Sequence, residues 1–419
     1  MTAREVARRV LDRVDKGGAW ATLALDGELA RASLDDRERR LASELVYGVL
    51  RHRTRLDRAL SAHASLSKTP PRVRTALRVA TYQLLFLDRV PSYAAVDDAV
   101  TAARAAGGAK VAGFANAVLR KVVSAGEPAL PADARARLEI EYSLPAWIAD
   151  ELAAAGGTAD TAAAFAQPAP LVARANRLRA TRDAVVDTLR AAGATAEPIE
   201  LAPEAIRVGE LGDPSRSPSF TAGEWTVQDT GAQLVGHVAA PRPGTRILDA
   251  CAGVGGKTTH LGELSGNAAD IDAADQSRTK LELCTQTAAR LGVTRIRTHL
   301  VDLLDRQAPL APAYDLVVVD APCTGLGVLR RHPDAKWRLA ADDVPRLARL
   351  QAQLLDALAA RVAPGGALVY SVCTFTRAEG PDQIRAFAAR SGMRLVSETR
   401  TWPPDADAFY IARLERGPA

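Results

Sequence analysis

Apolar residues recur at every third or fourth position through the first 125 residues. The spacing is clearest in three series: Val6, Val10 and Val14; Leu41, Leu45 and Val49; and Val73, Leu77, Ala80 and Leu84. This period is that of an amphipathic α-helix whose apolar face packs on a core. Ser33, three residues before Asp36, is a candidate capping box for the second of these helices. The pair Gly107-Gly108 and the segment GEP at 126–128 break the pattern, and its periodicity predicts that residues 1–125 form an all-α bundle.

Prolines punctuate the stretch that follows. Residues 126–167 carry three prolines and one amphipathic segment, PAWIADELAAA, which predicts a helical linker. Residues 168–238 combine a strand pattern, PLVARANRL, with a helix pattern, TRDAVVDTLRAAGA. This part of the chain is therefore predicted to be a small α/β subdomain.

From residue 239 to the end, short apolar runs alternate with amphipathic helices. The strand candidates are residues 245–249, 270–275, 296–301, 315–319 and 366–372. This alternation predicts an α/β Rossmann-like domain, in which helices cover both faces of a parallel sheet. Ligands bind beyond the carboxyl ends of the strands in such sheets. Five polar residues stand at or just after the predicted strand ends: Asp249, Asp275, Asp302, Asp320 and Cys373.

Composition narrows the class of protein without identifying it. With 419 residues, 47% of them hydrophobic and 25% charged, the chain is long enough for two or three globular domains. A net charge of +5 is compatible with a polyanionic partner but does not require one. The N-terminus lacks the apolar run of a secretion signal, and no apolar run approaches membrane-spanning length. The four cysteines show no CxxC spacing, so we expect no metal site and reduced thiols in the cytoplasm.

A glycine-rich segment, DACAGVGGKTTH, follows the first strand of the Rossmann-like region and opens a helix. Small residues let the backbone approach a ligand, and the N-terminus of a helix favours negative charge. The segment fails the dinucleotide pattern G-x-G-x-x-G at Thr258 and the Walker A pattern at Cys251, each by one residue. The remaining common ligand for such a loop is S-adenosylmethionine (SAM). The candidate cofactor-binding residues in the loop are Cys251, Ala252, Gly253, Val254, Gly255, Gly256 and Lys257.

Two aspartates extend the candidate cofactor site. Asp275, at the end of the second strand, is placed for the ribose hydroxyls, and Asp302, after the third, for the adenine amino group. Each has an equally plausible local role, because Asp275 can cap the helix that begins near Ser277 and Asp302 can cap a turn. Because both aspartates follow the glycine loop at the ends of successive strands, the interpretation as cofactor-binding residues is favoured.

Two cysteines occupy nearly the same local setting. Cys323 lies in DAPCTG and Cys373 in YSVCTF, each at the end of a predicted buried strand. The local pattern does not distinguish a nucleophile from a packed thiol, nor one cysteine from the other. The following segment, RRHPDAKWR, offers four candidate RNA-binding residues: Arg330, Arg331, Lys336 and Trp337. Its alternative is a solvated loop with one packed tryptophan.

Several of these segments resemble known families. LDACAGVGGKT, DAPCTGLGVLRRHPDAKW, YSVCTF and DAFYIARL are similar to the RNA cytosine-C5 methyltransferases of the NOL1/NOP2/Sun family. LVYGVLRHRTRLD, LRVATYQLLFLDRVPSYAAVDDAV and GFANAVLRKV resemble the antitermination factor NusB. EYSLPAWI and VQDTGAQLV, between these halves, match as well. The combination resembles the bacterial branch that acts on 16S ribosomal RNA, and it covers almost the whole chain.

The resemblance implies a multidomain fold and a mechanism. An all-α NusB-like helical bundle would precede the small α/β subdomain and a Rossmann-like SAM-dependent methyltransferase domain. Cys373 would attack carbon 6 of the cytosine, and Cys323 would assist product release. Asp320 would contact cofactor or base, holding the exocyclic amine and, if protonated, ring nitrogen N3. The implied partner is free or early-assembly 16S rRNA bound by a monomer, with no membrane involved.

Three motifs depart from the family pattern. Gly253-Val254 replaces the usual Ala-Pro, Val372-Cys373-Thr374 replaces Thr-Cys-Ser, and Ala408 replaces glycine. None of them removes a reacting group. Two alternative functions follow: the same chemistry on transfer RNA, and a non-catalytic RNA-binding assembly factor whose altered loop no longer binds the cofactor. The presence of both Cys323 and Cys373 argues against the second.

Overall fold

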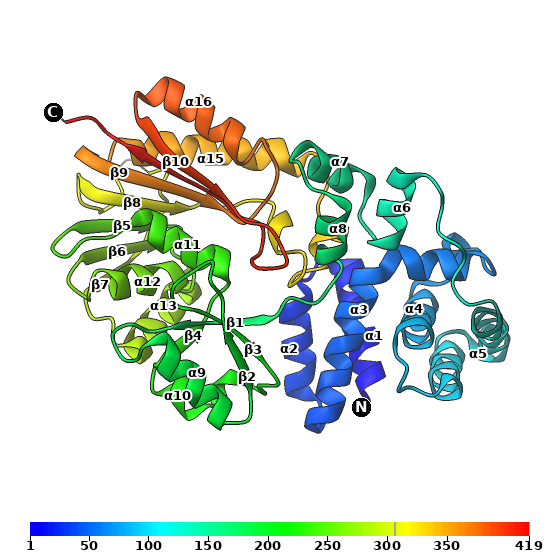
Figure 1. The fold of residues 1–419 in the computed structure, drawn as a ribbon. Coiled ribbons are helices and arrows are strands. Elements are labelled where there is room, and N and C mark those ends of the chain that lie inside the picture. Colours follow the sequence, from blue (N-terminus) through cyan, green and yellow to red (C-terminus); the bar gives the residue numbers. More distant parts are fainter. Residues whose placement is uncertain (306, 419) are drawn as a thin grey trace. The chain divides into compact units, whose positions relative to one another are not determined.

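The computed structural model describes residues 1–305 and 307–418 (Figure 1). The chain divides into two compact units. The first comprises Met1–Gln167 and Leu329–Leu339, and the second comprises Pro168–Val328 and Ala340–Ala419. Each unit is described by itself.

The first unit is helical, as the spacing of apolar residues predicted. Its elements are α1 (Ala3–Gly17), α2 (Ala21–Arg31), α3 (Asp36–Ser61), η1 (Leu66–Lys68), α4 (Pro71–Phe86), α5 (Ser92–Ala125), α6 (Ala134–Glu141), α7 (Ala146–Ala154), α8 (Ala159–Phe165) and α14 (Ala335–Arg338). Val6, Val10, Leu45 and Leu77 are buried in its core. The predicted capping box at Ser33 is wrong, because Asp35 caps α3 by accepting a hydrogen bond from the Glu38 backbone amide.

The predicted break at Gly107-Gly108 is confirmed. Both residues have non-helical backbone angles inside α5, and Gly108 has a φ of +77°. A positive φ of this kind is readily adopted by glycine, which has no Cβ to clash with the backbone. The two halves of α5 are therefore joined by a kink at the position that the sequence indicated.

Residues 329–339 belong to the first unit, although the sequence suggested a continuous second domain from 239 to 419. The buried carboxylate of Asp334 accepts a hydrogen bond of 3.2 Å from the Ala21 amide at the start of α2. Trp337 packs on the core formed by α1–α4 and donates from Nε1 to the Leu50 carbonyl at 2.7 Å. Long-range packing of this kind leaves no periodic signal in the sequence.

The second unit begins with a four-stranded antiparallel sheet in the order β2-β3-β1-β4. Its elements are β1 (Leu171–Ala175), α9 (Arg182–Ala191), β2 (Thr195–Pro198), β3 (Ala205–Gly209), η2 (Pro214–Arg216), α10 (Pro218–Thr221) and β4 (Trp225–Val227). Val185, Leu189 and Trp225 are fully buried in the cluster between α9 and this sheet.

A seven-stranded sheet follows in the order β10-β11-β9-β8-β5-β6-β7. Its strands are β5 (Arg246–Ala250), β6 (Asp270–Asp275), β7 (Ile296–Leu300), β8 (Tyr314–Asp320), β9 (Val362–Val372), β10 (Arg394–Arg400) and β11 (Tyr410–Glu415). The five predicted strands are confirmed as β5–β9, and they pair with one another in parallel. β10 and β11 pair antiparallel at one edge and were not predicted, because β10 is largely exposed and lacks an apolar run.

Helices cover both faces of this sheet (Figure 1). They are α11 (Thr230–Ala239), α12 (Gly256–Leu264), α13 (Arg278–Leu291), α15 (Asp343–Ala359) and α16 (Pro381–Ser391), with the short helix η3 (Leu326–Val328) after β8. Val317 and Val319 of β8 face a core shared with α15 and α16, whereas Leu316 and Val318 face one shared with α11 and α12. This alternation is the side-chain period of a strand, so each face of β8 is buried.

The chain order creates a switch point between β5 and β8. From β5 the chain continues through β6 and β7 on one side, and then returns to β8 and β9 on the other. Connections that leave in opposite directions open a crevice at the carboxyl ends of the two central strands. Among the helices of the described residues, none has the length and apolar character needed to cross a membrane.

Candidate active site

A cavity of about 620 Å³ lies at the carboxyl ends of the central strands in the second unit. Six of the predicted site residues line it: Cys251, Gly253, Asp275, Asp320, Cys323 and Cys373. They lie at or just after the ends of β5, β6, β8 and β9. The expectation that a site forms beyond the carboxyl ends of the strands therefore identified residues that are up to 122 positions apart in the chain. Leu303, Leu304, Leu350 and Leu354 add an aliphatic wall suited to a planar ring.

The glycine loop between β5 and α12 has a strained backbone. Cys251, Gly253 and Gly255 all have positive φ, at 61°, 58° and 86°. A Cβ on Gly255 would lie 2.6 Å from the Cys284 Sγ atom, so a side chain does not fit there. Val254 is half-exposed, Ala252 is buried and Gly256 begins α12. The loop therefore presents bare backbone beside the cavity, which fits the approach of a cofactor.

Asp275 fastens this loop to the end of β6. Its carboxylate accepts hydrogen bonds from the Gly253 amide at 3.0 Å and from the Ser277 amide at 2.8 Å. Ser277 rather than Asp275 caps α13, because its hydroxyl accepts from the Lys280 amide, so the predicted capping role of Asp275 is wrong; the Asp275 side chain lines the cavity. Asp302 accepts from Gln276 Nε2 and from the Leu304 amide as a turn cap, and it is exposed beside the cavity rather than in its wall.

The two thiols meet at the cavity wall. Cys323 Sγ and Cys373 Sγ are 3.5 Å apart. The contact with Cys373, together with burial, raises the pKa of Cys323 well above its ordinary value. Cys323 is therefore a protonated thiol at neutral pH that can donate to the sulfur of Cys373.

A buried glutamate fixes the distance between the thiols. Glu379 accepts from the Thr324 amide at 2.8 Å and from the Thr324 hydroxyl at 2.6 Å, next to Cys323. It also accepts from Thr376 Oγ1 at 2.8 Å, close to Cys373. Glu379 is fully buried, so these bonds replace its hydration. The sequence analysis missed this residue, because neither its segment nor its spacing matches a catalytic motif.

Lys257 and Asp320 form an ion pair at the same wall. Lys257 Nζ donates to Asp320 Oδ2 at 2.6 Å, and Ser371 Oγ donates to Asp320 Oδ1 at 2.8 Å. Burial alone would lower the pKa of Lys257, but the adjacent carboxylate raises it above its ordinary value. Both oxygens of Asp320 accept from donors, an arrangement that suits an ionised carboxylate rather than the protonated form considered from the sequence.

Two other polar groups near the loop are removed from solvent. Burial raises the pKa of Cys251 to about 12, so this thiol is inert at neutral pH although it lines the cavity. Asp249 lies within β5 rather than beyond it; burial raises its pKa to about 7, and it accepts from Thr258 Oγ1 at 2.5 Å. Asp249 therefore supports the start of α12 from beneath and does not face the cavity.

The predicted RNA-binding segment needs a correction. Arg330 and Lys336 are only 4% and 3% exposed, inside the first unit. Lys336 Nζ donates to the carbonyls of Arg51 and Tyr142, and the Arg330 carbonyl accepts from Arg51. In this structure the two residues anchor the segment, so they do not offer a surface for phosphate. Arg331 and Trp337 are half-buried, and an RNA contact by them stays a prediction.

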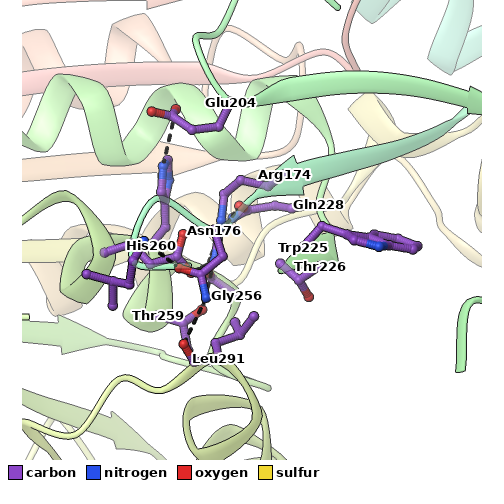
Figure 2. Close-up of polar contacts among 12 residues, drawn as sticks. Arg174, Asn176, Glu204, Trp225, Thr226, Gln228, Gly256, Thr259, His260 and Leu291 are labelled. Carbon is purple, nitrogen blue, oxygen red and sulfur yellow. Dashed lines mark hydrogen bonds and ion pairs between the residues drawn. The ribbon is translucent and has the colours of Figure 1, made fainter. Parts of the chain in front are cut away.

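Arg174, which the sequence analysis missed, holds the loop from the other side. This buried side chain from β1 donates to Gln228 Oε1, to the Gly256 carbonyl at 2.8 Å and to Thr259 Oγ1 at 3.1 Å, as Figure 2 shows. It also pairs with the buried carboxylate of Glu263 at 2.6 Å. The small antiparallel sheet thus fixes the first turn of α12. An arginine inside an apolar strand pattern, PLVARANRL, was the available signal.

Comparison with known families divides the chain in three. Residues 1–124 match the NusB family, residues 144–213 match a ferredoxin-like domain of RsmF/B-like methyltransferases, and residues 237–415 match the 16S rRNA methyltransferase RsmB/F family. The probable ribosomal RNA small subunit methyltransferase B of Synechocystis is 35% identical, covering 92% of this chain and 89% of its own. The corresponding protein of Xylella fastidiosa is 37% identical, with 92% and 90% covered.

Solved structures share the fold. The crystal structure of PH0851 aligns over 99% of both chains with a TM-score of 0.80 at 24% identity. NSun6 from Pyrococcus horikoshii, solved with SFG, aligns over 69% of this chain and 98% of its own with a TM-score of 0.57 at 20% identity.

Proposed function

This chain belongs to the RsmB/F family of 16S rRNA methyltransferases, and from that premise we propose that it methylates carbon 5 of a cytidine in 16S rRNA with SAM as the donor. The observation that carries the proposal is the thiol pair: Cys323 and Cys373 lie 3.5 Å apart on a cavity that also contains Asp320. One thiol can attack the base while the other controls its release.

The chemistry needs a nucleophile because carbon 5 of cytosine is unreactive towards a methyl group. The sulfur of Cys373 forms a bond to carbon 6, and the electrons of the C5–C6 double bond are displaced so that carbon 5 becomes nucleophilic. Bound SAM supplies the electrophilic methyl group. Removal of the carbon 5 proton then restores the double bond as the carbon 6–sulfur bond breaks, and the electron pair returns to Cys373.

The neighbouring side chains support these steps. The Lys257 ammonium interacts electrostatically with Cys373 and places a positive charge near the attacking sulfur. Asp320 accepts a hydrogen bond from Lys257, and its carboxylate is also suited to accept one from the exocyclic amine of the base. Cys323 is protonated and lies 3.5 Å from the attacking sulfur, so during release it can give its proton to the departing Cys373 sulfur and take up the carbon 5 proton in exchange.

The base must leave its stack to enter the cavity, so the substrate region is single-stranded or remodelled RNA. We expect the chain to act as a monomer on free or early-assembly 16S rRNA, with the NusB-like unit adding contacts to the RNA. Gly253-Val254 adds a flexible glycine to the loop, but Asp275 fixes the Gly253 amide, which supports cofactor binding.

The test uses alanine variants of the thiols. Wild type, Cys373→Ala and Cys323→Ala are incubated with 16S rRNA and SAM, and the products are separated on denaturing gels and sequenced after bisulfite treatment. Cys323→Ala is expected to accumulate a covalent protein–RNA adduct, whereas Cys373→Ala forms neither adduct nor 5-methylcytidine. Cys284→Ala, which removes a buried thiol outside the cavity wall, is the matched control.

Four results would contradict the proposal. Methylation at the normal rate by Cys373→Ala would remove the covalent mechanism, and an adduct that depends on Cys323 alone would reverse the roles of the thiols. Equal methylation of transfer RNA would replace the proposed substrate. Failure of the wild type to bind SAM in a direct titration would favour a non-catalytic assembly factor.

A further inference from the structure

Away from the cavity, one carboxylate and two imidazoles converge inside the second unit. Glu204 lies just before β3, His237 is in α11 and His260 is in α12. Their donor atoms all lie within 4.8 Å of one another. Figure 2 shows the Glu204 side chain pointing at the ring of His260. Neither the proposed reaction nor the family resemblance uses these three side chains.

The separations suit a small metal ion. Glu204 Oε2 lies 2.7 Å from His237 Nε2 and 3.8 Å from His260 Nε2. A tetrahedral Zn²⁺ site with bonds of about 2.0–2.1 Å holds its ligand atoms roughly 3.3 Å apart. The observed distances lie on either side of this value, so shifts below about 1 Å in the side chains complete the geometry. Two imidazoles and a carboxylate are a ligand set that zinc commonly takes.

His260 provides an independent observation. Its side chain is fully buried, yet within the described residues neither ring nitrogen has a hydrogen-bond partner. Buried polar atoms are nearly always hydrogen-bonded, so this ring calls for another explanation. Helix α11 leaves space for it, because a Cβ on Gly236 would lie 2.5 Å from His260 Nδ1. The other nitrogen, Nε2, faces Glu204.

The charge states also favour a cation. Burial, with a contribution from Arg174, lowers the pKa of His260 to about 3, so its imidazole is neutral and has a free lone pair. Burial alone would raise the pKa of Glu204, but the neighbouring imidazoles of His237 and His260 bring it below its ordinary range. Protons therefore compete weakly for two of the three ligands at neutral pH. Arg177 lies 3.6 Å from Glu204, but it is half-exposed and can turn to solvent.

We propose that Glu204, His237 and His260 bind a divalent transition-metal ion, most favourably Zn²⁺, with water as the fourth ligand. His237 is 25% exposed and gives the ion its path from solvent. The bound ion joins the β3 region of the small sheet to α11 and α12 and stabilises the second unit. The expectation of no metal site rested on cysteine spacing alone, whereas this site uses histidines 23 residues apart.

The experiment uses the untagged full-length chain, freed of metal and titrated with Co²⁺ and Zn²⁺. We expect one Co²⁺ per chain with visible d–d absorption, displacement by Zn²⁺, and a rise in the unfolding temperature with either ion. His237→Asn is expected to weaken Co²⁺ binding at least 10-fold. The matched control is His299→Asn, which breaks a similar histidine–carboxylate pair with Asp272 at 3.0 Å and 22% exposure. It is expected to bind as the wild type does.

The results that overturn the proposal are specific. Absence of saturable binding at equimolar ion, or equal binding by His237→Asn, refutes the site. A strong thiolate-to-cobalt charge-transfer band assigns the ion to the Cys323–Cys373 pair instead. If His237→Asn does not fold, Glu204→Gln provides the same comparison, because its amide keeps the volume and loses the charge. Cobalt binding needs no RNA or SAM, so it is independent of the methyltransferase proposal.

Discussion

Lys336 offers a direct test of how burial acts on charge in the first unit. Burial, reinforced by Arg51, lowers the pKa of its ammonium group from 10.5 to about 7. Between these values the unfolded chain binds a proton that the folded chain has released, so stability rises with pH through this window. With one pKa unit worth about 1.36 kcal/mol, the free energy of unfolding should increase by about 3 kcal/mol between pH 7 and pH 9.5.

The assay compares wild type with Lys336→Met by urea denaturation across this pH range. Methionine keeps the length of the side chain and removes its titration, so the difference between the two proteins cancels tyrosines and cysteines that titrate in the same window. Lys336→Met also loses the hydrogen bonds to the Arg51 and Tyr142 carbonyls, which lowers its stability. This loss does not produce the predicted rise of the difference with pH. A difference that stays constant from pH 7 to 9.5 would refute the reasoning and show that Lys336 remains charged in its buried setting.

Two further variants test the supports of the glycine loop. Gly255→Ala forces a side chain at φ +86° into contact with Cys284, so the variant should lose about 1–3 kcal/mol of stability and bind SAM more weakly in calorimetry. The control is Gly266→Ala, which also has a positive φ but no neighbour within 4 Å, and it should bind SAM as the wild type does. Arg174→Met leaves the buried Glu263 carboxylate unpaired and should lower the free energy of unfolding in urea by about 3–5 kcal/mol. The control is Arg295→Met, which breaks an exposed pair and should lower it by at most about 1 kcal/mol. Equal losses would show that burial does not increase the cost of breaking the Arg174–Glu263 pair.

Periodic and local features of the sequence predicted much of the fold. Strands β5, β6, β8 and β9 were predicted because burial on both faces leaves apolar runs, and the helices because their apolar positions repeat at the helical period. The strand-end rule then placed Cys323 and Cys373 on one cavity without any knowledge of distances. Each of these inferences depends on neighbours along the chain or on the general topology of α/β sheets.

The features that the sequence analysis did not predict depend on contacts between residues that are distant in the sequence. The sequence of segment 329–339 is typical of a basic surface loop. Arginine, lysine and tryptophan can either bind a phosphate or donate to buried backbone carbonyls, and the residue types alone do not distinguish these roles. Glu379 and Arg174 act through partners 55 and 89 residues away, such as Thr324 and Glu263. No periodicity reports such pairs. The Glu204–His237–His260 cluster was missed for the same reason.

The polar residues that escaped prediction share one physical role. Burying the carboxylate of Glu379 or the guanidinium of Arg174 costs desolvation free energy, which well-formed hydrogen bonds only offset. An apolar residue would pack at lower cost, but it would not fix the direction of a loop. Glu379 binds the two loops that carry the thiols, and Arg174 binds the first turn of the helix after the glycine loop. Buried polar networks therefore set the geometry of this cavity. The free energy gained by packing the apolar core offsets the cost of burying their charged groups.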